Sequence, residues 1–163
     1  MNRLVFVCMG NICRSPLAEV MARAALERAG LGAVLSCVSR GTHAYHLDHP
    51  ADVRSIAVAD RHGLDLNGHA SRLVLPADFG PGDLILAMDR RNVQDLRGKA
   101  PAHAVGRIRL LMDLAGKPGV EVPDPYYGTE RDFDVVFELL QEGIEGLTKH
   151  LLRLHNAGVL NME

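Results

Sequence analysis

Short, uninterrupted apolar runs alternate along the chain with segments whose apolar residues recur every three or four positions. The first run, Val5–Cys8, has no polar alternation, which is typical of a strand buried on both faces. The apolar stripe that follows Ser15 and Pro16 has helical spacing and ends at Gly30. Because serine is a favourable N-cap and proline suits the first turn, we expect the first helix to begin here, capped by Ser15.

Further elements follow toward the C-terminus. They are a strand at Val34–Val38, a helix capped by Asp52 and closing near Gly63, a strand at Leu84–Met88, a helix capped by Asp89 and ending at Gly98, and a strand within residues 105–114. For this last segment a helix is the alternative. The strongest periodic signal is a final helix with Thr129 and Asp132 spaced as a capping box and an apolar face made of Phe133, Val136, Phe137, Leu140, Ile144, Leu147, Leu151 and Leu154.

Strands separated by helices indicate an α/β protein with a parallel sheet that helices cover on both faces. We expect a single domain over residues 1–163, with the four predicted strands in one twisted, Rossmann-like sheet. Ligands of such sheets bind beyond the carboxyl ends of the strands. The loop that follows Cys8 falls at that edge, which makes it the expected position of the functional site.

Composition and charge exclude several classes of function. The chain of 163 residues is 47% hydrophobic and 23% charged, as is ordinary for a globular α/β protein. Its formal net charge of −2 gives no reason to expect nucleic acid or a membrane surface as partner. The first apolar run is too short for a secretion signal and nothing approaches a membrane span, so we expect a cytoplasmic protein. Three cysteines, an odd count, indicate thiols rather than a disulfide framework.

The loop between Cys8 and Ser15 has the features of an anion cradle that holds a nucleophile. Its peptide N–H groups have no strand or helix partner, and the start of the helix adds partial positive charge. Arg14 supplies a planar fork of donors that matches two oxygens of a phosphate. The same positive field favours the thiolate of Cys8, which is a nucleophile for covalent phosphoryl transfer.

Cys8 considered alone is more commonly a small buried hydrophobic residue. The combination with Gly10, Asn11 and Arg14 favours a site instead, because a purely structural turn does not require an arginine at that offset. The glycine-rich signatures of nucleotide-binding loops are absent from this stretch.

The segment Cys8-Met9-Gly10-Asn11-Ile12-Cys13-Arg14-Ser15-Pro16 resembles the signature of the low-molecular-weight protein tyrosine phosphatases. A second segment, Asp124-Pro125-Tyr126-Tyr127, is similar to the general-acid loop of that family. The resemblance covers the whole chain and implies the family's fold, a four-stranded parallel sheet with helices on both faces. The cysteine signature alone is moderately specific, and the two segments together are strongly so.

The resemblance implies hydrolysis of phosphotyrosine through a cysteinyl-phosphate. Cys8 attacks phosphorus, and Asp124 protonates the leaving oxygen and then activates water. Arg14 and the N–H groups of the loop, formed by Met9, Gly10, Asn11, Ile12 and Cys13, hold the phosphate oxygens. Ser15 stabilises the sulfur of Cys8 as a leaving thiolate.

Around these groups the family analogy implies a supporting shell and a pocket wall. The side chain of Asn11 is tied to Ser15, Ser39 and His69, although each of these also has an ordinary structural interpretation as a turn residue, a strand end or a surface histidine. The wall for an aromatic leaving group is formed by Tyr126, Tyr127 and Tyr45. Bacterial members more commonly have Trp at the position of Tyr45, which leaves substrate preference open.

Several residues keep alternative interpretations. Cys13 either forms a reversible disulfide with Cys8 or packs as a small residue, and Cys37 falls in a predicted strand as a core residue. The spacing of His43, His46 and His49 matches no zinc pattern, so we expect no metal and no cofactor. Arg40 is a candidate for an extra anion contact at the pocket rim. We expect a monomer that acts on a phosphotyrosine protein, such as a bacterial tyrosine kinase, or on a small aryl phosphate.

Two other classes of protein compete with this interpretation. A thioredoxin-coupled arsenate reductase uses a similar loop but needs relay cysteines on a mobile segment, and residues 70–100 contain none. A non-catalytic phosphotyrosine-binding protein would lack Cys8 or Asp124, and this chain has both. Phosphatase chemistry is therefore the expected function.

Overall fold

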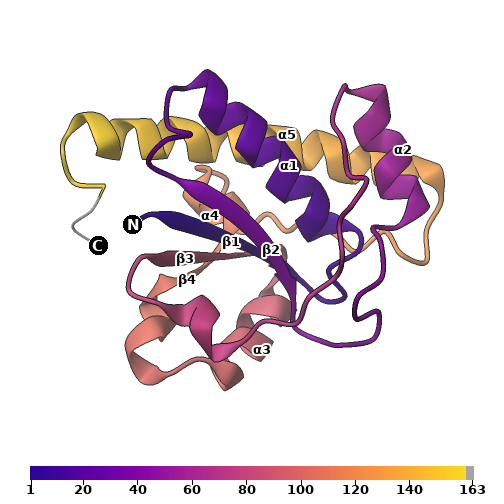
Figure 1. Ribbon diagram of the computed structural model, residues 1–163, viewed down its shortest axis with the longest axis horizontal. Coiled ribbons are helices and arrows are strands. Elements are labelled where there is room, and N and C mark those ends of the chain that lie inside the picture. The colour runs from indigo at the N-terminus through magenta and orange to yellow at the C-terminus, as the bar shows by residue number, and fades with distance from the viewer. Residues whose placement is uncertain (161–163) are drawn as a thin grey trace.

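A computed structural model describes residues 1–160 and shows a four-stranded, fully parallel sheet between two layers of helices (Figure 1). The strands are β1 (Arg3–Cys8), β2 (Ser36–Gly41), β3 (Asp83–Ala87) and β4 (Ile108–Leu110), in the spatial order β2-β1-β3-β4. The predicted α/β class and four-stranded parallel sheet are confirmed.

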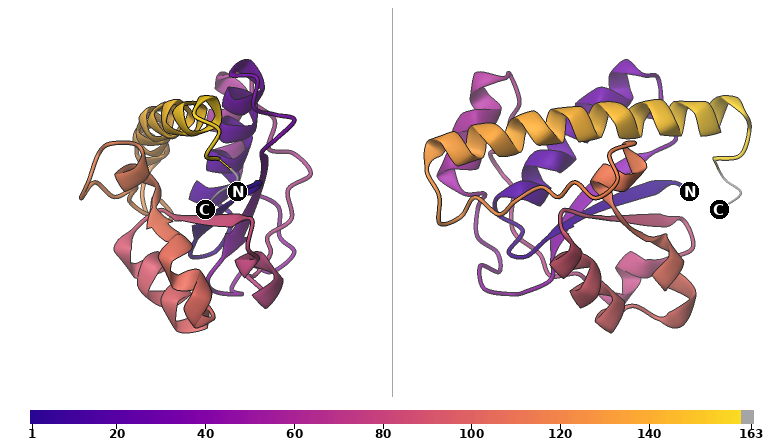
Figure 2. Two further views of the ribbon diagram at one scale, coloured as in Figure 1. Left: turned by 90° about the vertical axis from the view of Figure 1, so that its left-hand side faces the viewer. Right: turned by 180° about the vertical axis from the view of Figure 1, so that it is seen from behind.

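One face of the sheet packs against α1 (Arg14–Arg28) and the long α5 (Glu130–Asn156), with α2 (Val53–Arg61) and α4 (Leu111–Leu114) beside them. The other face is covered by α3 (Arg90–Lys99) and two 3₁₀ turns, η1 (Pro76–Phe79) and η2 (Ala102–Arg107). Figure 2 shows α5 running along the length of the molecule on the same side of the sheet as α1. In the part of the chain that the structure describes, no helix is long and apolar enough to cross a membrane.

The central strand β1 explains why its sequence is apolar without alternation. Leu4 and Phe6 point into the core shared with α1 and α5, while Val5 and Val7 point into the core shared with α3. All four side chains are fully buried, so neither face tolerates a polar residue.

Helix starts follow the predicted capping chemistry in three cases. Asp52 accepts a hydrogen bond from the backbone N–H of Arg54, and Asp89 accepts one from Asn92. At the start of α5, Asp132 accepts from the backbone N–H of Thr129 at 2.7 Å. The predicted face of α5 is buried except at Leu154, which is partly exposed where the helix extends past the core.

The predicted cap of the first helix is wrong. Cys13 occupies the N-cap position without a side-chain hydrogen bond, and Ser15 lies inside the first turn of α1. The hydroxyl of Ser15 is instead directed to Cys8 and Asn11. A tertiary contact has taken the side chain that local sequence preference assigned to the helix end.

The second strand begins and ends later than predicted. It covers Ser36–Gly41 rather than Val34–Val38, and Val34 lies exposed in the turn before it. Its pairing with β1 aligns Cys8 with Gly41, which extends the strand through polar residues. In the segment 105–114 only Ile108–Leu110 is strand, and the flanking residues belong to η2 and α4. The predicted strand and the alternative helix are therefore each present in part of the segment.

The sheet order places a crevice at the end of β1. The helix that follows β1, α1, packs on one face of the sheet, and the helix that follows the neighbouring β3, α3, covers the other face, so the connections from these two strands go to opposite faces. Such a reversal opens a gap beyond the carboxyl ends of the strands, where ligands of parallel sheets bind. The loop from Met9 to Cys13 fills the floor of this gap.

Candidate active site

The loop after β1 is a tight turn with its backbone donors unused. Asn11 has a left-handed backbone with φ of 56°, which asparagine tolerates better than most residues. Across residues 1–160, no protein atom accepts a hydrogen bond from the backbone N–H groups of Met9 to Arg14. Because α1 begins at Arg14, the positive end of its dipole adds to this ring of donors. The loop can therefore bind an oxyanion with several oxygens.

The segment after β2 holds this loop from behind. The carbonyl oxygen of Cys8 accepts from the N–H of Thr42, and that of Met9 accepts from His43, each at 3.0 Å. Gly41 lies so close that a Cβ atom on it would stand 2.8 Å from the carbonyl oxygen of Met9. Glycine is required at this position because the two backbones touch.

Arg14 is almost entirely buried at the entrance of the helix, with a relative exposure of 1%. One of its terminal nitrogens donates to Asp89 at 2.7 Å and to the carbonyl oxygen of Val122 at 2.9 Å. Burial acts to lower the pKa of Arg14, but the negative charges of the Cys8 thiolate and of Asp89 outweigh it and the pKa is raised. The guanidinium is thus a fixed, permanently charged donor beside the loop.

A buried hydrogen-bond network lies directly beneath the loop. The sulfur of Cys8 is 3.0 Å from the hydroxyl of Ser15. The amide nitrogen of Asn11 donates to Ser15 at 2.8 Å and to Ser39 at 3.0 Å. His69 donates through Nε2 to the main-chain carbonyl of Asn11 at 2.7 Å, so it contacts the backbone and not the side chain that was expected. The network fixes the left-handed turn and the position of the thiol.

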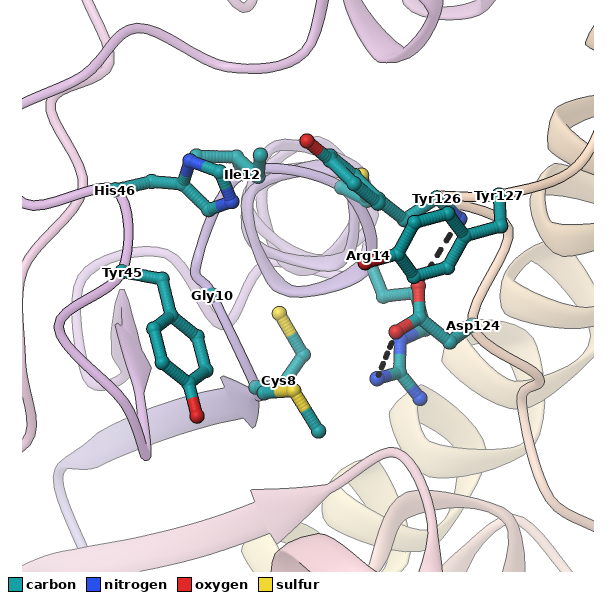
Figure 3. Close-up of a pocket in the computed structure, with 11 residues that line it drawn as sticks. Cys8, Gly10, Ile12, Arg14, Tyr45, His46, Asp124, Tyr126 and Tyr127 are labelled. Atoms are coloured by element: carbon teal, nitrogen blue, oxygen red, sulfur yellow. Dashed lines mark hydrogen bonds and ion pairs between the residues drawn. The ribbon is translucent and has the colours of Figure 1, made fainter.

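Asp124 comes from a distant part of the sequence to the same place. Its Oδ2 is 3.8 Å from Nη2 of Arg14, and its Oδ1 accepts from the backbone N–H of Tyr126 at 3.1 Å (Figure 3). The carboxylate is 41% exposed, so it faces the pocket and solvent rather than the core. A thiol and a carboxyl group thereby flank one anion cradle.

These groups line a single pocket of about 310 Å³. Its lining contains every residue that the sequence placed in the nucleophile, the loop, the clamp, the acid and the wall except Asn11, together with His46, which the sequence did not place there. The lining residues are Cys8, Met9, Gly10, Ile12, Cys13, Arg14, Tyr45, His46, Asp124, Tyr126 and Tyr127. Tyr45 and His46 form one side, and Tyr126 and Tyr127 form the other, above the loop (Figure 3). Asn11, Ser15, Ser39 and His69 lie behind the pocket as its support.

The arrangement agrees with comparisons to known proteins. A sequence model of the low molecular weight phosphotyrosine protein phosphatases matches residues 3–156. The chain belongs to this family. A low molecular weight protein-tyrosine-phosphatase of Streptomyces coelicolor is 41% identical over 149 residues, which cover 89% of this chain and 90% of the relative.

Solved structures of other members of the family have the same fold. A protein tyrosine phosphatase of Entamoeba histolytica with Hepes in its active site superposes with a TM-score of 0.87 at 34% identity, covering 97% of this chain and 99% of that one. The Wzb protein of Vibrio vulnificus in complex with benzylphosphonate has a TM-score of 0.80 at 30% identity, covering 91% and 97%. The chain is thus a low molecular weight protein-tyrosine phosphatase.

The sequence did not predict the contacts that three residues make at or near this site. His46 lines the pocket and its ring lies 5.6 Å from that of Tyr126. Asp89 was predicted only as a helix cap, yet its second oxygen binds Arg14. Arg54 donates to the carbonyl oxygen of Tyr126. Only Asp89 had a usable signal in the sequence, because it directly follows a strand at the carboxyl edge of the sheet.

The structure overturns the suggested role of Arg40. Its Nε donates to Asp78 at 3.1 Å and its Nη1 donates to the carbonyl of Ser39, so the side chain turns away from the pocket. Arg40 faces outward from β2 because Ser39 on the adjacent position faces inward, and strand residues alternate. Arg40 therefore forms a structural ion pair with Asp78 and does not bind an anion at the pocket rim.

The three histidines after β2 interact with aromatic rings. His43 stacks on Tyr45 with centroids 5.2 Å apart, and His46 lies 5.8 Å from His49. Among residues 1–160, no three His, Cys, Asp or Glu side chains come close enough together to hold a metal ion. Of the three, His46 lines the pocket, and His43 packs against the wall residue Tyr45.

The second cysteine of the loop is a buried thiol. Burial, assisted by the negative charges of Asp52 and Cys8, raises the pKa of Cys13, so this thiol stays protonated. Cys37 is also buried, and burial raises its pKa to about 12. Of the two buried thiols, only Cys13 shares a pocket with Cys8.

We expect peroxide to convert the Cys8 thiolate to a sulfenic acid. The sulfur of Cys13 then bonds to that of Cys8, and the thiol proton of Cys13 leaves with the sulfenic hydroxyl as water. Activity lost to peroxide should return on reduction, and alkylation followed by peptide mapping should show a Cys8–Cys13 linkage. In the Cys13→Ala variant the loss should become irreversible. Inactivation of the wild type without any such linkage would mean that Cys13 is only a packing residue.

Proposed function

We propose that this phosphatase hydrolyses phosphotyrosine in two steps, with Cys8 as nucleophile and Asp124 as acid and then base. The sulfur of Cys8 forms a bond to phosphorus as the bond from phosphorus to the aryl oxygen breaks, and Asp124 gives its proton to that oxygen. Asp124 then takes a proton from water, whose oxygen attacks phosphorus and releases inorganic phosphate and the Cys8 thiolate.

Electrostatics support the assignment of the other groups. The transition state of phosphoryl transfer spreads negative charge over three equatorial oxygens, and the unused N–H groups of the loop together with Arg14 face that position. Ser15 lies 3.0 Å from the sulfur of Cys8, where a hydroxyl stabilises the thiolate as it leaves phosphorus.

The single observation that carries this proposal is the shared pocket. Cys8 and Asp124 are far apart in the sequence, yet both line one cavity whose floor is the anion cradle. A nucleophile and a proton donor on two sides of a bound phosphate is the arrangement that in-line displacement needs. A pocket lined by Cys8 without a facing carboxyl group would indicate binding alone.

The pocket wall selects an aromatic phosphoester. Tyr45, His46, Tyr126 and Tyr127 present ring faces above the cradle, which suits a flat leaving group. Cys8 lies at the bottom of the pocket with a relative exposure of 2%. A phosphate group reaches its sulfur only if a long side chain of the substrate carries it. We therefore propose that the substrate is a protein phosphorylated on tyrosine, such as a bacterial tyrosine kinase, rather than one phosphorylated on serine.

Paired peptides test this function. We expect kcat/KM for a phosphotyrosyl peptide to exceed that for the matched phosphoseryl peptide by about 10³-fold or more, because the shorter side chain leaves phosphorus away from the sulfur. Acid quenching during turnover should trap one phosphoryl group on Cys8, identified by peptide mass. Equal values of kcat/KM for the two peptides would contradict the proposal. So would turnover in which no phosphoryl group is trapped and a variant without Cys8 keeps its activity. Preference for small aryl phosphates over the phosphotyrosyl peptide would assign a low-molecular-weight substrate.

A further inference from the structure

The start of α2 connects the two halves of the active site. Arg54 donates through Nη2 to the carbonyl oxygen of Tyr126 at 2.9 Å and through Nη1 to that of Gly128 at 3.2 Å. Both carbonyls belong to the loop of residues 123–128, the acid loop, which carries Asp124. One side chain thus holds this loop at two points beyond the acid.

The acid loop has few other attachments. Before it, Val122 is fixed by its N–H bond to Met88 and by its carbonyl bond to Arg14. Within the loop, the N–H of Gly128 bonds to the carbonyl of Pro125, which is a turn closed on itself. Among residues 1–160, Arg54 is the one side chain from outside the acid loop that donates hydrogen bonds to its backbone carbonyls. Without Arg54, the backbone carbonyls of this stretch would accept no side-chain hydrogen bond from the rest of the described chain, and the 3.8 Å ion pair between Asp124 and Arg14 would remain.

The same turn of α2 also holds the phosphate-binding loop. The backbone N–H of Asp52 donates to the carbonyl of Ile12 at 2.8 Å, and the hydroxyl of Ser55 donates to that of Cys13 at 3.1 Å. Asp52 in turn binds Arg54 through two parallel hydrogen bonds of 3.0 and 2.9 Å. The distance between the cradle and the acid loop is therefore set by a short chain of contacts through Asp52 and Arg54.

The guanidinium of Arg54 is held in one orientation. Its central carbon lies 4.4 Å from the ring centroid of Phe133 and 5.9 Å from that of Tyr126. Burial opposes ionisation of Asp52, but the hydrogen bonds from Arg54 lower the pKa of this carboxyl group and keep the pair charged. A planar fork that serves one carboxylate and two carbonyls while stacking on a ring is a geometry that lysine does not reproduce.

From these contacts we infer that Arg54 is a positioning residue for leaving-group protonation: it fixes the acid loop, and with it Asp124, at the correct height above the phosphate-binding loop. The inference rests on the proposed role of Asp124. Arg54 itself does not line the pocket and touches no reacting atom.

Arg54→Ala should therefore act selectively on substrates that need the acid. Phenyl phosphate has a poor leaving group and 4-nitrophenyl phosphate a good one. We expect kcat/KM to fall by about 10²-fold for the first and by less than about 3-fold for the second, because a displacement near 1 Å impairs proton transfer but leaves the cradle and Cys8 intact. Steady-state kinetics with both substrates measures this difference.

A double mutant tests the route of the effect. If Arg54 acts through Asp124, adding Arg54→Ala to Asp124→Asn should change the rate on phenyl phosphate by less than about 3-fold, since the acid is already lost. Arg61→Ala is the matched control, because Arg61 also joins α2 to α5 by an ion pair, with Asp134 at 2.6 Å, but contacts no loop of the site. This control should leave both rates within about 2-fold of the wild type.

Arg54→Lys is a second variant for the case that Arg54→Ala does not fold, because it keeps a positive charge beside Asp52. It should show the same selective loss at about 10-fold, with an unfolding midpoint near that of the wild type. Equal losses on both substrates in both variants, or additive losses in the double mutant, would overturn the positioning role. Failure of the proposed function would be seen differently, as a wild type whose rate on phenyl phosphate does not depend on Asp124.

Discussion

Replacing Cys8 by serine should lower kcat/KM for phosphotyrosyl peptides by about 10⁶-fold, the size of loss that follows removal of a catalytic nucleophile. The serine hydroxyl is a poor nucleophile at neutral pH, and the group that contacts this position, Ser15, is another hydroxyl and not a base. The N–H groups of the loop and Arg14 remain in place, so the variant should still bind phosphotyrosine and act as a trap for substrate. Stopped assays of phosphate release, with binding measured separately, test both parts.

Cys37→Ser is the matched control for this experiment. Cys37 is also a buried cysteine at the edge of the core, but it faces away from the pocket on β2. We expect its replacement to lower the unfolding midpoint without changing kcat/KM by more than about 2-fold. Substantial hydrolysis by Cys8→Ser would exclude the covalent route, and reduction of arsenate coupled to thioredoxin without phosphate release would indicate the arsenate reductase class instead.

Asp124→Asn should lower kcat/KM by about 10²–10⁴-fold on substrates with poor leaving groups, which is the usual effect of losing a general acid. The amide keeps the size of the side chain and still accepts the hydrogen bond from Tyr126, so the loop should keep its shape. It cannot transfer a proton. The loss should be much smaller for 4-nitrophenyl phosphate, whose leaving group departs without protonation.

The control is Glu121→Gln, a change of the same kind at the approach to the same loop. Glu121 binds Arg90 at the surface and does not line the pocket. Its replacement should leave rates unchanged on both substrates, since surface ion pairs contribute little. If Asp124→Asn behaves like Glu121→Gln, Asp124 has no part in the reaction and the wall of the pocket serves binding only.

Local patterns in the sequence determined most of the architecture. The unbroken apolar run of β1 predicts a central strand because both of its faces must be buried. The stripe along α5 predicts a long helix because a side chain every three or four positions meets the core. Asp52 and Asp89 predict helix starts because an aspartate satisfies a backbone N–H two or three residues ahead. Each of these signals comes from residues that lie close together in the sequence, so it can be read without the tertiary structure.

The anion cradle is also local in origin, since Cys8 and Arg14 are close in sequence and the helix that follows supplies the field. What the sequence by itself did not determine are the contacts between distant segments. Ser15 binds Cys8 rather than capping its helix, and Asp89 binds Arg14 as well as capping its own. Arg54 joins two loops that are far apart in the chain. These outcomes depend on the order of the strands and on the close approach at Gly41, which tertiary packing alone decides, because a hydrogen bond forms only after the fold has brought its two groups within reach.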